Sequence, residues 1–158
     1  MQSAPEMNEA PAAARRAALA LLARATEPEL AKPLTQFWPD LAVRDLRKPE
    51  TGLVMVRGRI GSDGAAFNLG EATVTRAVVE LPGGQRGYGQ MLGREARLAR
   101  MAAIADALWQ DVTSRPRVEE AVLSPIRQRL AQAAANDAAQ AAATRVDFFT
   151  LVRGESEP

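Results

Sequence analysis

The chain has 158 residues, a formal net charge of +1, no cysteine and no histidine. The length suits a single domain, and the two missing residue types exclude disulfides, thiolate nucleophiles, imidazole bases and zinc sites that need sulfur or imidazole ligands. The 20 basic residues are interspersed with 19 acidic ones, so no basic block indicates nucleic-acid binding.

The apolar content consists largely of small side chains. About a fifth of the chain is alanine, which removes little area from water. We therefore expect a thin core that depends on close helix packing or on a partner interface. Lys32 and Lys48 are the only lysines. The preference for arginine suits bidentate pairing with carboxylates or phosphates, although a GC-rich genome would produce the same bias.

The first third of the chain predicts a tail and two helices. Residues 1–11 are polar and aperiodic, which is typical of a disordered tail. Helices are expected over 12–24 and 27–36, the second with Thr26 as N-cap, followed by an irregular connector between Pro39 and Pro49. Arg24 interrupts the short apolar run RRAALALLARA, and no 18-residue apolar run exists, so we expect a cytoplasmic protein without a signal peptide or membrane span.

The rest of the chain predicts a meander and further helices. Strands are expected over 53–60, 72–81 and 86–92, with turns at 61–64 and 82–84. A helix over 94–112 carries an apolar stripe. After a break at 114–116 come a helical turn at 119–123 and a long alanine-rich helix to about Thr144, with Ser124 as N-cap and Pro125 at its first position. Residues 146–152 alternate as in a fourth strand.

These elements define an α+β fold, an antiparallel sheet of three to four strands with helices packed on one face. The predicted domain covers residues 12–153, and residues 154–158 are expected to form a flexible tail.

Polar residues in the first two strands allow two interpretations. Alternation places Arg57 and Arg59 on one face, and Val54, Val56 and Ile60 on the other, which is the expected core side. Arg57 opposite Glu71 would form an ordinary surface ion pair. Alternatively, several side chains build one polar contact patch, which Arg76 joins only through a twist or bulge. The patch consists of Arg57, Arg59, Asn68, Glu71, Thr73 and Arg76.

The string GYGQMLGR, residues 87–94, also has two interpretations. Glycines before a helix N-terminus are found in phosphate-binding loops, but the spacing does not match GxGxxG and no GK[ST] follows. Glycines that permit close strand packing explain it equally well. Arg94 falls near the apolar stripe by helical angle, so its charge must reach out of the helix end or find a partner or ligand.

The carboxylates do not form an obvious catalytic or metal-binding set. Glu119 and Glu120 point to different sides of a helix, and Asp106 and Asp111 lack companions for metal binding. We interpret them as solvated, and we assign no catalytic residue, no metal site and no bound cofactor to this chain.

Four segments carry a family resemblance: PETGLVMVRGRIG, FNLGEATVTR, LGREAR and TRVDFFTLVRGE. In this order they resemble the PhnG family, accessory subunits of the bacterial carbon–phosphorus lyase system, over about residues 12–154. The resemblance implies a core complex with PhnH-, PhnI- and PhnJ-type subunits. With a PhnL-type protein, that system replaces the adenine of ATP by a phosphonate, and the PhnI-type subunit is expected to perform the nucleosidase-like chemistry.

The chain departs from the family pattern at Ala77, where many relatives have cysteine, and at Leu98, where many have histidine. Neither position therefore offers a catalytic group here. Three functions remain open: a noncatalytic subunit of a multisubunit transferase whose polar patch docks a PhnI-type partner, a structural assembly factor, and a free-standing nucleotide-binding protein using residues 87–93.

Overall fold

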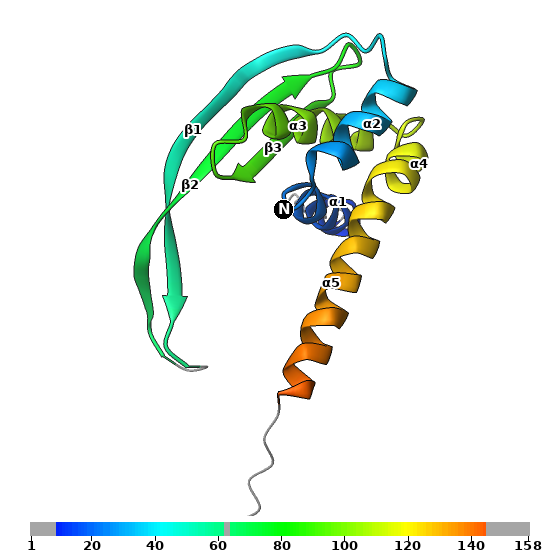
Figure 1. Ribbon diagram of the computed structural model, residues 1–158. Helices are drawn as coiled ribbons and strands as arrows, with labels where there is room; N and C mark the ends of the chain where they lie inside the picture. The colour runs from blue at the N-terminus through cyan, green and yellow to red at the C-terminus, as the bar shows by residue number, and fades with distance from the viewer. Residues whose placement is uncertain (1–8, 62–63, 145–158) are drawn as a thin grey trace, which may run out of the picture. The chain divides into compact units, whose positions relative to one another are not determined.

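The computed structural model describes residues 9–61 and 64–144. The chain divides into two compact units, Met1–Arg127 and Gln128–Pro158; the sheet lies in the first unit, and the long helix α5 begins there and ends in the second. The elements in chain order are α1 Glu9–Leu22, α2 Glu27–Phe37, β1 Arg44–Arg59, β2 Ala66–Glu80, β3 Arg86–Leu92, α3 Ala96–Gln110, α4 Arg115–Val118, the π-helical turn η1 Glu119–Leu123 and α5 Ser124–Ala143. The antiparallel sheet has the order β1-β2-β3 (Figure 1), which confirms the α+β prediction.

The ends of the predicted domain are only partly described. Helix α1 begins at Glu9, inside the expected tail of residues 1–11, and residues 1–8 lie outside the described part. The expected strand over 146–152 and the tail over 154–158 also lie outside it. The domain boundaries therefore stay predictions.

Helix α2 starts where its capping signal predicts. The backbone N–H and the hydroxyl of Thr26 donate to the Glu29 carboxylate at 2.8 and 2.9 Å. In a capping box, the carboxylate at the third helical position accepts from the N–H of the N-cap residue. Here this bond satisfies the Thr26 N–H, which has no partner within the helix. The helix ends at Phe37, one residue beyond the prediction.

Strands β1 and β2 are longer than the sequence pattern predicts. β1 begins at Arg44, so the connector expected up to Pro49 is wrong for residues 44–49. The ladder to β2 shifts register between Arg47 and Glu50, and this irregularity accommodates Pro49 because proline cannot donate to a ladder. β2 begins at Ala66, six residues before the predicted start at Ala72.

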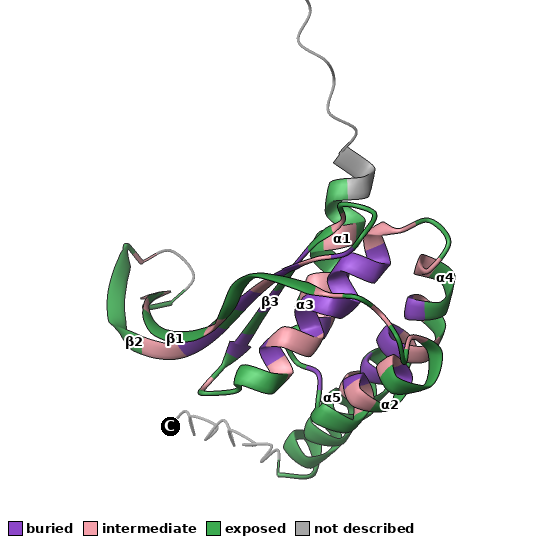
Figure 2. Ribbon diagram, turned by 90° about the horizontal axis from the view of Figure 1, so that it is seen from above, coloured by how far each residue is buried: buried purple, intermediate pink, exposed green. Residues whose placement is uncertain are grey.

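Helix α3 packs on one face of the sheet at very short distance. A Cβ atom on Gly87 would lie 1.8 Å from the carbonyl oxygen of Ala103, and one on Gly89 would lie 1.8 Å from that of Ala99. Alanines on the helix and glycines on β3 thus let two backbones approach closely. Figure 2 shows α3 as the most buried element, and its residues Ala99, Ala102, Ala103, Ala105 and Ala107 are at most 1% exposed. The expected close packing of small side chains is confirmed.

The segment after α3 runs continuously into α5. The predicted break at 114–116 is wrong for residues 115 and 116, which are helical: α4 starts at Arg115 and η1 follows it directly. Ser124 has φ −63° and ψ −48°, a helical conformation, so the prediction that it is an N-cap is also wrong. Val118, Val122, Leu123 and Ile126 are fully buried, which explains why packing overrides the local capping signal. In the second unit, the described residues of α5 include no buried side chain.

Candidate functional site

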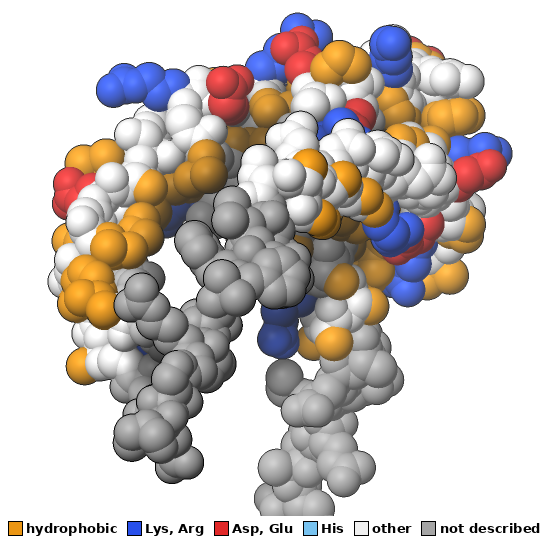
Figure 3. All heavy atoms as spheres, turned by 60° about the horizontal axis from the view of Figure 1, so that its bottom comes forward, with side chains coloured by type: hydrophobic (Ala, Val, Ile, Leu, Met, Phe, Trp, Pro, Cys, Tyr) orange, Lys and Arg blue, Asp and Glu red, His pale blue; other side chains and the backbone are white. Residues whose placement is uncertain are grey.

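The most exposed part of the sheet is a two-stranded ribbon, defined here as residues 52–61 and 64–73. In Figure 1 it extends beyond the region where α3 covers the sheet. Large apolar side chains are exposed along it, with Leu53 61%, Leu69 62% and Ile60 78% accessible. Figure 3 shows hydrophobic side chains gathered over this part of the molecule. Exposure of contiguous large apolar side chains is typical of a protein–protein contact.

One face of the ribbon mixes charges with large apolar groups. Arg57 is opposite Asn68, Met55 is opposite Glu71 and Leu53 is opposite Thr73. Directly paired residues of an antiparallel ladder point to the same side, so the first five predicted patch residues share this face: Arg57, Arg59, Asn68, Glu71 and Thr73.

The interpretation that Arg57 lies opposite Glu71 in an ion pair is wrong, because the register places Glu71 opposite Met55. The ladder shifts between Val56 and Arg57, because β2 carries one extra residue at Leu69. This bulge moves Asn68 opposite Arg57. Among the described residues Arg57 has no ionic partner, whereas Arg59 donates to the backbone carbonyl of Gly64 at 3.1 Å.

The other face of the ribbon is entirely apolar. It carries Val54 with Ala72, Val56 with Gly70, and Gly58 with Phe67. Leu69 lies over Gly58, where an added Cβ would be only 2.6 Å from its Cδ1. The prediction that this is the core side is wrong: Val56 is 39% exposed and Ile60 78%, because no described helix of the first unit covers the ribbon.

Arg76 and Arg94 do not join the patch. Arg76 is opposite Glu50 and Gln90, one position out of phase with Thr75, so it faces the side of the sheet away from α3. Arg94 is exposed and precedes α3, which begins at Ala96. Its charge therefore lies outside the helix, as the sequence required.

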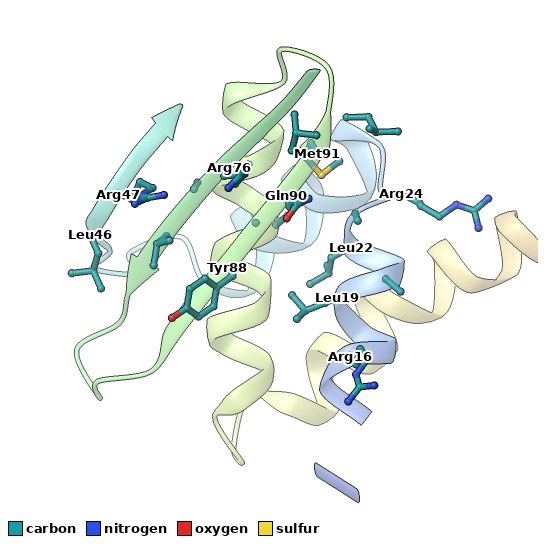
Figure 4. A pocket seen from close by; sticks show the side chains of 18 residues that line it. Arg16, Leu19, Leu22, Arg24, Leu46, Arg47, Arg76, Tyr88, Gln90 and Met91 are labelled. Carbon is teal, nitrogen blue, oxygen red and sulfur yellow. The ribbon is translucent and has the colours of Figure 1, made fainter. Parts of the chain in front are cut away.

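Arg76 instead lines a groove of about 950 Å³ between α1 and this open side of the sheet. Figure 4 shows Arg76, Tyr88 and Gln90 on the strands and Arg16 on α1 across from them. The lining has four arginines and no acidic residue: Arg16, Arg24, Arg47 and Arg76. Sequence analysis missed Arg16, Arg24 and Arg47 because they are distant in sequence and meet only through the packing of α1.

A buried carboxylate fixes the wall of this groove. Asp106 is 0% exposed, and it accepts two bonds from the Arg15 guanidinium at 3.0 and 2.7 Å and one from the Tyr88 backbone N–H at 2.9 Å. The prediction that Asp106 is solvated is wrong. The hydrogen bond to Asp106 raises the pKa of Arg15 above its ordinary value, and the pair attaches α1 to α3 and β3.

The glycines of residues 87–93 are explained by packing. Gly87 and Gly89 are buried against the α3 backbone, so they do not face a bound phosphate. Gly93 has φ +82°, a conformation that favours glycine, and its N–H donates to the Thr73 carbonyl at 2.8 Å. The geometry thus favours the packing interpretation of the GYGQMLGR string.

Three other carboxylates have structural roles, whereas Glu120 is solvated as predicted, with its side chain 73% exposed. Glu119 accepts from the Trp109 indole N–H at 2.7 Å, and Asp111 accepts from the Ser114 backbone N–H at 2.8 Å. Glu80 accepts from Arg44 and from Arg86, and these bonds lower its pKa. Over residues 9–61 and 64–144, no cluster of carboxylates suits a metal ion, and no helix is both long and apolar enough to span a bilayer.

Comparison with known proteins decides the family. A family profile described as phosphonate metabolism protein PhnG matches residues 13–154. The chain belongs to the PhnG family. A curated protein named alpha-D-ribose 1-methylphosphonate 5-triphosphate synthase subunit PhnG, from Rhizobium meliloti (strain 1021), is similar, with 49% identity over 155 residues covering 98% of this chain and 99% of that protein.

The predicted resemblance to PhnG is thus confirmed over nearly the whole chain. Ala77 is 1% exposed opposite Gly89, and Leu98 is half-buried near the start of α3. Both are apolar packing residues in this PhnG family member.

Proposed function

We propose that this chain is a noncatalytic subunit of a synthase that transfers the ribose 5-triphosphate moiety of ATP to a phosphonate with release of adenine, in the catabolism of organic phosphonates. The observation that carries the proposal is the 49% identity, over nearly the full length, to a curated subunit named for such a synthase. The substrates ATP and phosphonate belong to the complex, and the proposal assigns no cofactor to this chain.

The chemistry of the side chains supports a noncatalytic role. Adenine leaves more readily when a general acid protonates it, and enzymes place an imidazole or a carboxyl group with a raised pKa for this task. This chain has no histidine, and the buried carboxylate Asp106 is held by a guanidinium. We therefore expect the reacting groups on a PhnI-type partner. PhnH- and PhnJ-type subunits and a PhnL-type protein are the other expected partners.

The ribbon supplies the surface for such a partner. Burying a large apolar side chain completely contributes roughly 1.5–3 kcal/mol. The ribbon exposes six large apolar side chains, Leu53, Met55, Val56, Ile60, Phe67 and Leu69. Since each is already partly covered, docking would add only a fraction of that value for each, or several kcal/mol together. The adjacent polar face, with Arg57, Asn68 and Glu71, supplies directed contacts that set orientation.

The test is co-expression of the full chain with PhnI-, PhnH- and PhnL-type subunits, followed by adenine release from ATP plus methylphosphonate. We expect the double variant Arg57→Ala/Arg59→Ala to lower both complex yield and adenine release. The control Arg97→Ala/Arg117→Ala removes the same charge outside the ribbon and is expected to retain both. Unchanged assembly and turnover in the ribbon variant would refute the docking role, and turnover by the isolated chain would refute the noncatalytic role.

The same experiment separates a structural assembly factor from an active-site contributor. A factor that only stabilises its partners predicts normal adenine release per assembled complex in the ribbon variant. A subunit that shapes the partner's site predicts a lower rate per assembled complex.

A further inference from the structure

On the outer edge of β3, only some of the backbone N–H and C=O groups have a hydrogen-bond partner. The bonds from Leu81 N–H to the Gln85 carbonyl and from Gly93 N–H to the Thr73 carbonyl set the phase of the ladder between β2 and β3. With that phase, the odd-numbered residues of β3 bond to β2. The even-numbered residues direct their backbone N–H and C=O away from it.

Side chains satisfy the first part of this edge. The Tyr88 N–H donates to Asp106 at 2.9 Å, and the Arg86 carbonyl accepts from Arg15 at 3.2 Å and from Gln110 at 2.7 Å. Within the described residues, the N–H and C=O of Gln90 have no such partner. An open stretch of edge offers a template for another strand.

The groove lies directly beside this open stretch. Its lining includes Gly89, Gln90 and Met91 of β3 and Leu19, Ala20 and Ala23 of α1. Apolar side chains from α1 and from all three strands line the groove, and the lining contains four arginines and no acidic residue. Arg47 pairs with Glu50 at 3.0 Å, but among the described residues Arg16 and Arg76 have no ionic partner.

We propose that the groove binds an extended acidic segment of another synthase subunit, which adds to β3 as a fourth strand at Gln90. Such a segment would pair its backbone with Gln90, place apolar side chains between α1 and the sheet, and direct carboxylates to Arg16 and Arg76.

The lining favours a polypeptide over a small polyphosphate. Most lining side chains are apolar, and an open backbone edge matches the repeating N–H and C=O groups of a polypeptide. This contact goes beyond the proposed function because it is a second docking surface, separate from the ribbon.

Photocrosslinking tests the location. The full chain carries a photoreactive amino acid at Leu92, which lines the groove and is 74% exposed, or at the control position Val112, which is 80% exposed and outside the groove. In the complex co-expressed with its partner subunits, we expect crosslinks from Leu92, but not from Val112, to one segment of another subunit that contains Asp or Glu. Crosslinks only within this chain or only between two copies of it would overturn the proposal.

Two sets of variants test the chemistry. Gln90→Pro removes an N–H that β2 does not use, whereas Gln90→Thr keeps it, so we expect a loss of affinity of at least about tenfold for the proline variant alone. Arg16→Glu/Arg76→Glu should weaken assembly, and Lys32→Glu/Lys48→Glu, with the same change in net charge, should not. Melting temperatures of the isolated variants verify that each is folded.

The outcomes separate this proposal from the docking role of the ribbon. Loss of assembly in the ribbon variant with normal assembly in both groove variants overturns only the groove proposal. Binding of inorganic tripolyphosphate that depends on Arg16 and Arg76, without a crosslinked segment, would assign the groove to a small anion and would also overturn it.

Discussion

Replacing Gly89 by alanine should be among the most damaging single-methyl changes in the chain. The new Cβ would lie 1.8 Å from the Ala99 carbonyl oxygen and 2.8 Å from the Ala103 nitrogen. Ordinary contact begins at 3.4 Å, so the strand and helix would have to separate by about 1.6 Å. Both neighbours are backbone atoms of α3, and they cannot move aside by rotating a side chain.

The cost follows from what α3 supports. The helix packs against all three strands and against α1, α2 and α4, so a displacement opens contacts throughout the core. Overpacking a well-packed interior typically costs 1–3 kcal/mol, and the rigid neighbours place Gly89→Ala at about 3 kcal/mol. For a domain of this size, that corresponds to a fall in Tm of roughly 6–12 °C.

Gly52→Ala provides a matched control. A Cβ at Gly52 has nothing within 4 Å, and its φ is not positive. The same substitution removes the same unfolded-chain entropy at both sites, so the difference between the two variants isolates the native-state clash. Unfolding in urea, followed by circular dichroism, gives both free energies. A Gly89→Ala value within about 0.5 kcal/mol of Gly52→Ala would refute the packing argument.

Three further substitutions probe polar groups of the first unit. Asp106→Asn should lower the free energy of unfolding by about 2–3 kcal/mol at pH 7, because Arg15 loses a buried partner; an unchanged urea midpoint would contradict this. Glu80 has a lowered pKa in the folded state, so its carboxylate stabilises the fold above its unfolded pKa of about 4.5 and this contribution disappears as pH falls through the folded value. Stability should therefore fall less on acidification in Glu80→Gln than in the parent, as thermal melts across that range would measure. Trp109→Phe removes the indole donor to Glu119 and should cost about 1 kcal/mol; equal melting curves would contradict it.

Helix and strand boundaries that depend on capping or turn residues could be predicted from the sequence. The Thr26 cap and the glycines at the ends of β3 correctly placed α2 and β3. The start of β1 was missed because its irregular register around Pro49 is accommodated by pairing with β2, a contact some 30 residues away. Ser124 was misassigned because a capping residue is equally compatible with a helix interior when neighbouring side chains are buried.

The candidate surfaces were predictable only in part. Alternation correctly placed Arg57 and Arg59 on one face, but period alone does not reveal whether a helix covers the opposite face. The register places Glu71 opposite Met55, and the bulge at Leu69 places Asn68 opposite Arg57. Gly70 follows this bulge, but a glycine in a strand does not by itself fix the pairing register. The groove depends on Arg15 bonding to Asp106 across 91 positions of sequence, which no periodicity encodes.

The exposed ribbon affects what happens to copies of this chain that are made without partner subunits. A copy without partners exposes the apolar side chains of the ribbon to every other newly made chain, and such surfaces self-associate or attract chaperones and proteases. On the proposed function, surplus copies would be removed instead of stored. Production matched to that of the other subunits, as translation from one shared message provides, would keep the pool of orphan copies small.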